Sequence, residues 1–280
     1  MKYQEIINKG SKILKLNNIK SFNLDSEILL SSSLKLNRSQ LLLNLDKKIN
    51  SEQEKIFFSL IKRRAKFEPI AYITGYKNFW KNKFKVNKNV LIPRPDTETL
   101  VEQVLKEIKI YNSRRILDIG TGSGCIILSI LMERKKCYGV GLDISKKAIN
   151  LAKYNAKIQQ IKNRIKFYNS DIDNFCRGKY DLIVSNPPYI NKHDLKYLER
   201  DVVNFEPRLA LDGGLDGLSE IRKVIKKSSE LIKKNGKFIL EIGFDQRNKV
   251  INLLKQKGFY INSTLRDFAN NDRCIICTKI

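Results

Sequence analysis

The sequence is poor in the residues that most often bind metals or exchange protons. Its 280 residues include one histidine, His193, and five cysteines, an odd number scattered along the chain. Two cysteines have the C-x-x-C spacing, but they lie in a strand-like run and not at the start of a helix. Without a cluster of histidine and cysteine we expect no metal site and no zinc. Reduced, mostly buried thiols are the better interpretation for Cys125, Cys137, Cys176, Cys274 and Cys277.

Long apolar runs are also missing. No stretch of about 18 apolar residues is present, so no transmembrane helix is expected. The first residues lack the continuous apolar region of a secretory signal. We therefore expect a cytoplasmic protein with no membrane partner. A hydrophobic content of 42% is enough for a packed core, and the length allows one large or two ordinary domains.

Acidic residues are scarce relative to basic ones, and the formal net charge is +25. Such a charge suggests nucleic-acid binding. However, lysine accounts for 39 of the 54 basic residues, and the excess is even: residues 1–80 carry 15 basic and 7 acidic residues, residues 81–280 carry 39 and 22. No arginine-rich or aromatic-interleaved stripe stands out. We interpret the charge as mainly compositional and expect no stable nucleic-acid complex, although it favours binding to a ribosome or another acidic surface.

Three regions follow one another along the chain. Residues 1–76 have the spacing of short amphipathic helices, and Ser51–Glu54 has the pattern of a capping box. This region is predicted to be a small helical domain for substrate recognition. Residues 77–94 are predicted to be a β-hairpin linker, because Phe79–Val86 alternates apolar and polar residues around a lysine-rich turn. Residues 95–280 form the third region, and Pro95 suits the first turn of a helix.

The third region alternates between strands and helices. The last two of its seven strands are close enough to pair as an antiparallel hairpin, and the others are connected by helices or longer segments. This pattern predicts an α/β domain with a doubly wound, mostly parallel sheet. The expected strands are Arg115–Ile119, Cys137–Leu142, Arg164–Ser170, Tyr180–Ser185, Lys237–Ile242, Tyr260–Thr264 and Arg273–Thr278, and the expected helices are Cys125–Glu133, Ser145–Ile158, Leu218–Lys234 and Asp245–Lys257.

The most informative motif is Asn186-Pro187-Pro188-Tyr189, at the end of the fourth of these strands. The Asn186 side-chain oxygen and the Pro187 carbonyl can each accept one N–H bond of a planar –NH2 group. Proline fixes φ and has no N–H, so the backbone carbonyls point in preset directions. The Tyr189 ring offers a face or an edge to a flat amide or base. The tetrapeptide thus predicts a site that binds a planar amino group.

A glycine-rich loop, Gly120-Thr121-Gly122-Ser123-Gly124, follows the first strand. Glycines at a strand–helix junction allow a sharp turn and the close approach of a ligand. The dinucleotide fingerprint fails because Cys125 occupies its last position, and no lysine follows as in a P-loop. The carboxylate of Asp118 beside the loop would repel a pyrophosphate, but it suits a cationic or zwitterionic ligand such as the amino-acid part of S-adenosylmethionine.

Two further carboxylates follow the next strands. Asp143 is placed to accept hydrogen bonds from two ribose hydroxyls, and Asp171 from an adenine amine. Each could instead cap a helix or a loop, and individually the two interpretations have nearly equal weight. Together with Asn186, however, they supply the polar groups for one ligand at the carboxyl ends of adjacent strands, so we favour the cofactor interpretation.

With these motifs in hand, the chain resembles the class I S-adenosylmethionine-dependent methyltransferases that act on amide or amine nitrogens. More narrowly, it is similar to the release factor glutamine N5-methyltransferase family over almost its whole length. The resemblance is carried by the tetrapeptide, the glycine-rich loop and Asp143, and by the segments Glu68–Gly75, Leu91–Glu98, Phe205–Gly214 and Asp267-Phe268 with Asp272-Arg273. It implies a Rossmann-like methyltransferase sheet with a small all-helical N-terminal domain.

The resemblance also implies an activity. The substrate would be the glutamine of the Gly-Gly-Gln motif in class I peptide chain release factors, which act in translation termination. S-adenosyl-L-methionine would donate the methyl group and leave as S-adenosyl-L-homocysteine. Asn186, Pro187 and Tyr189 would be catalytic, with Pro188 also holding the glutamine. Cofactor binding would fall to Gly120–Gly124, Asp143, Asp171, Asn186 and Ile172, which stands where relatives often place an aromatic residue.

The chemistry needs no metal. A glutamine amide nitrogen is a poor nucleophile because its lone pair is delocalised into the carbonyl. If Asn186 and the Pro187 carbonyl accept both N–H bonds, the nitrogen becomes more tetrahedral and its lone pair more available. Positioning of two bound reactants can contribute about 7–11 kcal/mol in favourable cases.

We expect the protein to be a monomer.

Other substrates fit the same tetrapeptide. Glutamine N5 in a ribosomal protein is one alternative, and the amino group of adenine in DNA or RNA is another. The nucleic-acid alternative is disfavoured because no separate target-recognition insertion is visible. Around the motif, Arg94 and Glu98 either contact the substrate or close a domain interface, and Glu206 either orders the following loop or forms a surface ion pair.

Overall fold

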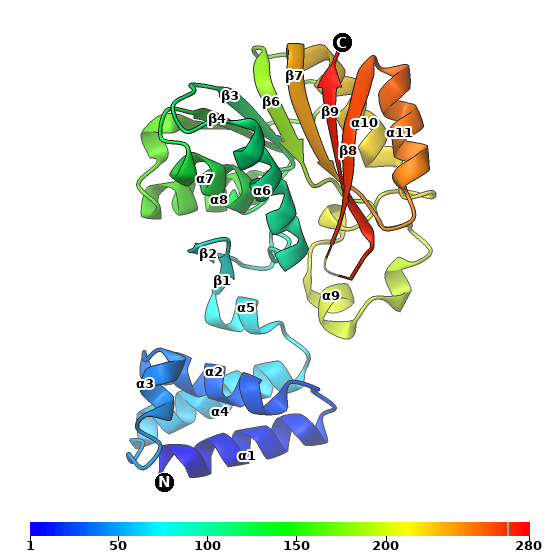
Figure 1. Cartoon of the computed structure of the whole chain (residues 1–280). Helices are drawn as coiled ribbons and strands as arrows, with labels where there is room; N and C mark the ends of the chain where they lie inside the picture. Colours follow the sequence, from blue (N-terminus) through cyan, green and yellow to red (C-terminus); the bar gives the residue numbers. More distant parts are fainter. Residues whose placement is uncertain (268) are drawn as a thin grey trace. The chain divides into compact units, whose positions relative to one another are not determined.

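The computed structural model describes residues 1–267 and 269–280, so Phe268 lies outside the described residues. Two compact units make up the chain (Figure 1). The first, here called the helical unit, consists of Met1–Gly75 together with Glu199–Phe205. The second, the sheet unit, consists of Tyr76–Leu198 and Glu206–Ile280.

The helical unit is built around apolar residues that recur with helical spacing, among them Ile6, Ile7 and Leu14, which are at most 5% exposed. A buried ion pair crosses the unit, with Arg64 Nε 2.7 Å from Asp25 Oδ2. The unit contains α1 (Tyr3–Leu16), α2 (Phe22–Leu34), α3 (Arg38–Leu42), α4 (Ser51–Ala65), α5 (Ile70–Thr74) and the later helix α9 (Arg200–Phe205). The sequence did not predict α9.

The expected capping box at Ser51–Glu54 is wrong by one residue. Asn50 has an extended backbone, and its side-chain oxygen accepts a 2.8 Å hydrogen bond from the Gln53 backbone N–H. Asparagine is among the strongest N-cap residues, so Asn50 takes that position and Ser51 becomes the first helical residue.

The sheet unit contains the seven-stranded sheet in the order β5-β4-β3-β6-β7-β9-β8. Strands β3 to β7 are parallel, and β9 is antiparallel to both β7 and β8. This is the predicted fold class. The strands are β3 (Arg115–Ile119), β4 (Tyr138–Asp143), β5 (Ile165–Asn169), β6 (Tyr180–Ser185), β7 (Ile232–Glu241), β8 (Phe259–Arg266) and β9 (Asp272–Lys279), and a separate hairpin is formed by β1 (Tyr76–Phe79) and β2 (Asn82–Lys85).

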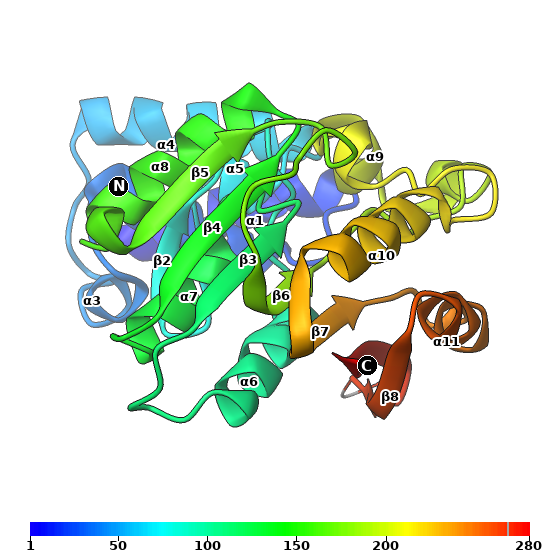
Figure 2. The same ribbon diagram turned by 90° about the horizontal axis from the view of Figure 1, so that it is seen from above.

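Helices cover both faces of this sheet (Figures 1 and 2). Alternate residues of one strand point to opposite faces. Ile116 of β3 therefore joins the core beneath α6, α7 and α8, and Leu117 joins the core beneath α10 and α11. The helices are α6 (Glu98–Glu107), α7 (Cys125–Glu133), α8 (Lys146–Ile158), α10 (Ser219–Leu231) and α11 (Arg247–Gln256), with short 3₁₀ turns η1 (Pro95–Thr97), η2 (Lys162–Arg164), η3 (Leu195–Tyr197) and η4 (Arg208–Ala210).

Two predicted boundaries need correction. The helix expected to continue to Lys234 ends at Leu231, and β7 begins at Ile232, five residues before the predicted strand. Ile232 pairs with Tyr180 ahead of a register shift, so the early part of β7 extends the pairing with β6. Pro95 does open a helical segment, but as the first residue of a 3₁₀ turn that precedes α6.

The scarce residues are placed as follows. Cys125, Cys137, Cys274 and Cys277 are buried free thiols, and Cys176 is an exposed one. Within residues 1–267 and 269–280, no group of three histidine, cysteine, aspartate or glutamate side chains is arranged to hold a metal ion. No helix in the same ranges has the length and apolar character needed to cross a membrane.

The packing of the helical unit leads to a stability prediction at Gly10. A Cβ at this position of α1 would lie 2.5 Å from the Phe57 ring and 2.6 Å from Ser26 Oγ. Gly10→Ala should therefore lower the free energy of unfolding by about 1–3 kcal/mol, despite the better helix propensity of alanine. Urea denaturation measures the change. The exposed neighbour Lys9→Ala should stay within about 0.5 kcal/mol of the wild type. Equal stability of the two variants would contradict this packing.

Candidate active site

Parallel pairing brings the predicted site residues to one edge of the sheet. β3 lies between β4 and β6, with Asp118 opposite Gly141 on one side and Val184 on the other. The loops that follow these strands therefore meet beyond the same edge, where they enclose a cavity of about 690 Å³. Of the predicted residues, the cavity is lined by Gly120, Thr121, Gly122, Ser123, Asp143, Asp171, Ile172, Asn186, Pro187 and Pro188.

The glycine-rich loop has backbone conformations that favour glycine. Gly120, Gly122 and Gly124 have φ of +74°, +55° and +81°, in the left-handed region. Gly124 is the N-cap of α7 and does not line the cavity, because it packs against that helix: a Cβ here would lie 3.1 Å from Leu128 Cδ1. The first four residues of the loop face the cavity and the fifth joins it to the helix.

Asp118 does not meet a ligand directly. Its side chain is 0% exposed and is not part of the cavity lining. Oδ2 accepts a 2.7 Å hydrogen bond from Thr121 Oγ1, and Oδ1 has no hydrogen-bond partner among the described residues. Burial raises the pKa of Asp118 to about 7, against the lowering effect of the Thr121 hydroxyl. The carboxyl group therefore supports the glycine-rich loop from behind, which is a structural role that the sequence did not indicate.

Asp143 has the position expected of a ligand-binding carboxylate. Its Oδ2 accepts from the Gly122 backbone N–H at 2.9 Å, and its Oδ1 accepts from the Ser145 N–H at 2.8 Å. The N-cap of α8 is Ser145, whose hydroxyl oxygen accepts from Ala148 N–H, so Asp143 is not the helix cap. Each carboxylate oxygen can accept a further bond. Burial raises the pKa of Asp143 above its ordinary value.

Asp171 and Ile172 begin the turn that follows β5. Asp171 Oδ1 accepts from the Asp173 N–H at 2.9 Å, which closes a local turn of the kind that the alternative interpretation proposed. The same residue nevertheless lines the cavity, and so does the partly buried Ile172, which packs against the core on the α10 side of the sheet. The turn thus orients Asp171 without removing it from the cavity.

Asn186 and Pro187 present two hydrogen-bond acceptors, one on the side chain of Asn186 and one on the backbone of Pro187. Asn186 Nδ2 donates to Thr97 Oγ1 at 3.1 Å. Among the described residues, no hydrogen bond reaches Asn186 Oδ1 or the Pro187 carbonyl oxygen. Because the amide nitrogen of Asn186 is held by Thr97, its oxygen is left to accept from another molecule. The recognition of a planar –NH2 group stays a prediction, for which these two acceptors are the candidate groups.

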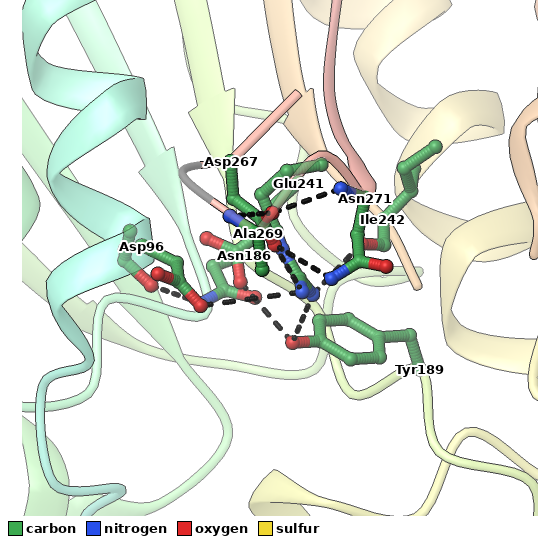
Figure 3. Close-up of polar contacts among 10 residues, drawn as sticks. Asp96, Asn186, Tyr189, Glu241, Ile242, Asp267, Ala269 and Asn271 are labelled. Atoms are coloured by element: carbon green, nitrogen blue, oxygen red, sulfur yellow. Dashed lines mark hydrogen bonds and ion pairs between the residues drawn. The ribbon is translucent and has the colours of Figure 1, made fainter. Parts of the chain in front are cut away.

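Tyr189 turns away from the cavity lining into a polar cluster (Figure 3). Its hydroxyl lies 3.3 Å from Glu241 Oε1 and 3.4 Å from Arg273 Nη1. Burial, followed by the negative charge of Glu241, raises the pKa of Tyr189 above its ordinary value. The side chain is therefore a neutral phenol that donates to Glu241 and can accept from Arg273.

Sequence reasoning missed Thr97 and Glu241 as parts of this site. Glu241 ends β7 and is 2% exposed, yet it carries a carboxylate. A glutamate that ends an otherwise apolar run, one strand along from the tetrapeptide, was a usable signal. Thr97 gave none, because a threonine beside a helix start usually acts as a cap.

The neighbouring charged residues have partners within the sheet unit. Glu206 is 6% exposed, accepts a 3.0 Å bond from the Ile92 N–H and forms an ion pair with Arg94, so it orders the loop after the tetrapeptide. Glu98 accepts from the Trp80 N–H at 2.8 Å and connects α6 to the hairpin. His193 is exposed in a loop.

Comparison with known proteins relates the chain to one family. The family model "PrmC N-terminal domain" matches residues 5–75, and "Methyltransferase small domain" matches residues 95–216. A release factor glutamine methyltransferase from Clostridium acetobutylicum is 40% identical over 100% of this chain and 99% of its own length. One from Coxiella burnetii is 39% identical over 93% of each chain.

A solved structure supports the fold of the sheet unit. The ribosomal protein L11 methylase from Lactobacillus delbrueckii subsp. bulgaricus aligns with a TM-score of 0.52 over 73% of this chain and 91% of its own. Its sequence is 18% identical. At this identity the likeness concerns the fold alone.

The buried Asp118 carboxyl leads to a prediction on stability and pH. Its folded pKa of about 7 lies above its ordinary value of 3.8, so the folded state binds more protons between these values and loses stability as pH rises. Asp118→Asn removes this titration. Between pH 5 and pH 7, the free energy of unfolding of the wild type should therefore fall by about 2 kcal/mol more than that of Asp118→Asn.

Urea denaturation at both pH values tests this prediction. Glu241 also has a raised pKa, so the variant should retain part of the pH dependence. An unchanged slope in Asp118→Asn would show that the carboxyl group does not titrate as described.

Proposed function

This chain belongs to the family of release factor glutamine methyltransferases, and we propose that it methylates the side-chain amide nitrogen, N5, of the glutamine in the Gly-Gly-Gln motif of class I peptide chain release factors. The methyl donor is S-adenosyl-L-methionine. The observation that carries this proposal is the pair of available acceptors, Asn186 Oδ1 and the Pro187 carbonyl, at a cavity that begins with the glycine-rich loop.

The cavity residues fit S-adenosylmethionine. A volume of about 690 Å³ is within the range of small-molecule sites. Asp143 retains acceptor capacity for ribose hydroxyls, Asp171 for the adenine amine, and Ile172 supplies apolar packing. Gly120 and Gly122 leave space for close approach, since a Cβ on either would meet nothing nearer than 4.0 Å but would be strained at a positive φ. We assign cofactor binding to the cavity-lining residues Gly120–Ser123, Asp143, Asp171 and Ile172, with Gly124 completing the loop as the N-cap of α7. Asn186 also borders the cofactor, but its side chain serves mainly to hold the glutamine.

The bound cofactor supplies an electrophilic methyl group. The chain's own part is to bind and orient the glutamine amide. Asn186 Oδ1 and the Pro187 carbonyl accept its two N–H bonds, which favours a tetrahedral nitrogen with an available lone pair. Pro187 and Pro188 hold these acceptors in fixed directions because φ is locked. After methyl transfer the nitrogen releases its proton to water. The single histidine of the chain, His193, is exposed in a loop and is not assigned as the base.

The helical unit is proposed to recognise the release factor. Its first 75 residues include the part matched by the N-terminal family model. The positive charge of the chain would assist the approach of an acidic partner without requiring a stable nucleic-acid complex. We propose that the enzyme acts as a monomer and uses no metal ion.

The substrate is tested by labelling. The protein is incubated with methyl-labelled S-adenosylmethionine and, separately, with a class I release factor, ribosomal proteins or DNA, and the label is located by mass spectrometry. Label on N5 of the Gly-Gly-Gln glutamine is the expected result. Transfer to nucleic acid alone would refute the proposal, and transfer to a ribosomal protein alone would replace the substrate.

The role of Asn186 is tested by truncation. Asn186→Ala removes one of the two acceptors and should lower kcat by about 100-fold or more, because the glutamine nitrogen is no longer oriented. The dissociation constant for S-adenosylhomocysteine, measured by calorimetry, should change less than about threefold. His193→Ala, in the exposed loop that follows, is the matched control and should keep wild-type kcat. An equal loss of cofactor binding and transfer in Asn186→Ala would limit Asn186 to the cofactor site.

A further inference from the structure

Glu241 and Thr97 contact opposite ends of the Asn186–Tyr189 tetrapeptide. β6 and β7 are parallel, with Ser185 opposite Leu240, so the next residue of β7 lies beside the start of the tetrapeptide. The Glu241 carboxylate accepts from the Tyr189 hydroxyl, with Oε1 and Oη 3.3 Å apart. The Thr97 hydroxyl accepts from Asn186 Nδ2 at 3.1 Å, and the same hydroxyl lowers the pKa of Glu241. Glu241 thus holds the Tyr189 end of the tetrapeptide (Figure 3), and Thr97 holds the Asn186 end.

This arrangement is costly for stability. Glu241 is 2% exposed, and its Oε2 has no hydrogen-bond partner among the described residues. Burial raises the pKa of Glu241 to about 7, although Thr97, Arg273 and Tyr189 lower it. Arg273 is itself shared with Asp267, at 2.8 Å, and with Asp96, at 4.0 Å. A buried ionic group seldom stabilises a fold more than apolar residues of the same shape would, so its presence next to a site indicates a functional reason.

The direction of the hydrogen bonds supplies that reason. An ionised carboxylate only accepts. Thr97 lowers the pKa of Glu241, as a hydroxyl that directs its hydrogen at a carboxylate does, and it meets Asn186 as an acceptor. The group of Asn186 that faces Thr97 is then the amide NH2, as the 3.1 Å contact has it. The amide oxygen of Asn186 is consequently directed away from Thr97.

We propose that Thr97 and Glu241 are positioning residues, which fix the Asn186 side-chain amide with its oxygen available to the substrate and hold Tyr189 at the other end of the tetrapeptide. This inference rests on the proposed function for its catalytic consequence. The hydrogen-bond order itself is a property of the protein without substrate, and it can be measured without any turnover.

The first test compares two substitutions of one residue. Thr97→Val has the same shape but no hydroxyl, and Thr97→Ser keeps the hydroxyl. With a release factor as substrate, Thr97→Val should lower kcat by about 10- to 100-fold. Its KM for the release factor and its calorimetric dissociation constant for S-adenosylhomocysteine should change less than about threefold. Thr97→Ser should recover at least about a third of wild-type kcat.

A second measurement needs no activity. The side-chain amide protons of Asn186 are assigned in ¹⁵N-resolved spectra by their loss in Asn186→Asp. In the wild type and in Thr97→Ser, one of them should be protected from solvent exchange by the bond to Thr97. In Thr97→Val that protection should be lost, by about tenfold or more in exchange rate.

Glu241→Gln tests the direction of the bonds and serves if Thr97→Val does not fold. A carboxamide can donate to Thr97, which frees the hydroxyl hydrogen for Asn186 and allows the Asn186 amide to turn over. Glu241→Gln should therefore lower kcat about tenfold or more while S-adenosylhomocysteine binding stays within about threefold.

The outcomes separate this inference from the proposed function. A wild-type protein that does not methylate the release factor refutes the proposed function, and the exchange comparison still decides the inference. Wild-type protection and kcat in Thr97→Val would overturn it. So would a loss in Thr97→Ser as large as that in Thr97→Val, or a parallel loss of S-adenosylhomocysteine binding, because each indicates a general structural role.

Discussion

The site depends on the parallel pairing of β6 with β3 on one side and β7 on the other. This pairing sets the end of β6 between the glycine-rich loop and Glu241, so that Asn186 has a cavity before it and a buried carboxylate beside it. A slip of one residue along β6 would turn every side chain of that strand to the other face. The register is secured by the apolar residues that β6 sends into both cores, Leu182 and Val184 on one face and Ile183 on the other.

Two buried carboxyl groups support this site without lining the cavity. Asp118 braces the glycine-rich loop through Thr121, and Glu241 holds the tetrapeptide at Tyr189 while Thr97 holds it at Asn186. In both cases a threonine hydroxyl stands between the carboxyl group and the cavity. A hydroxyl can accept one hydrogen bond and donate another, so a threonine held by a buried carboxyl group can in turn fix the direction of a neutral group beside the cavity. Because Asp143 and Asp171 also line the cavity, the site combines carboxylates at its surface with two carboxyl groups behind its wall.

Much of this organisation could be predicted from the sequence. The strands β3 and β6 and the helix α7 have the predicted bounds, because each is a mainly apolar segment between clear breaks. The loop and Asp143 line the cavity because parallel strands end at a common edge. Asp118 was misjudged, since proximity along the chain does not reveal which face of the strand a side chain occupies. Thr97 lies 89 residues from Asn186, and no local pattern connects two residues at that distance.

The short helix α9 makes the two units interdependent. The chain completes the first 75 residues of the helical unit, builds most of the sheet, and then returns to the helical unit for Glu199–Phe205. Within that unit Arg200 lies over the Phe67 ring, and Asp201 is 3.9 Å from Arg64. The units are consequently joined by three chain crossings instead of one. Neither can be exchanged between related proteins by a single splice, and a recombinant sheet unit that begins at the hairpin would carry a loop whose native partners had been removed.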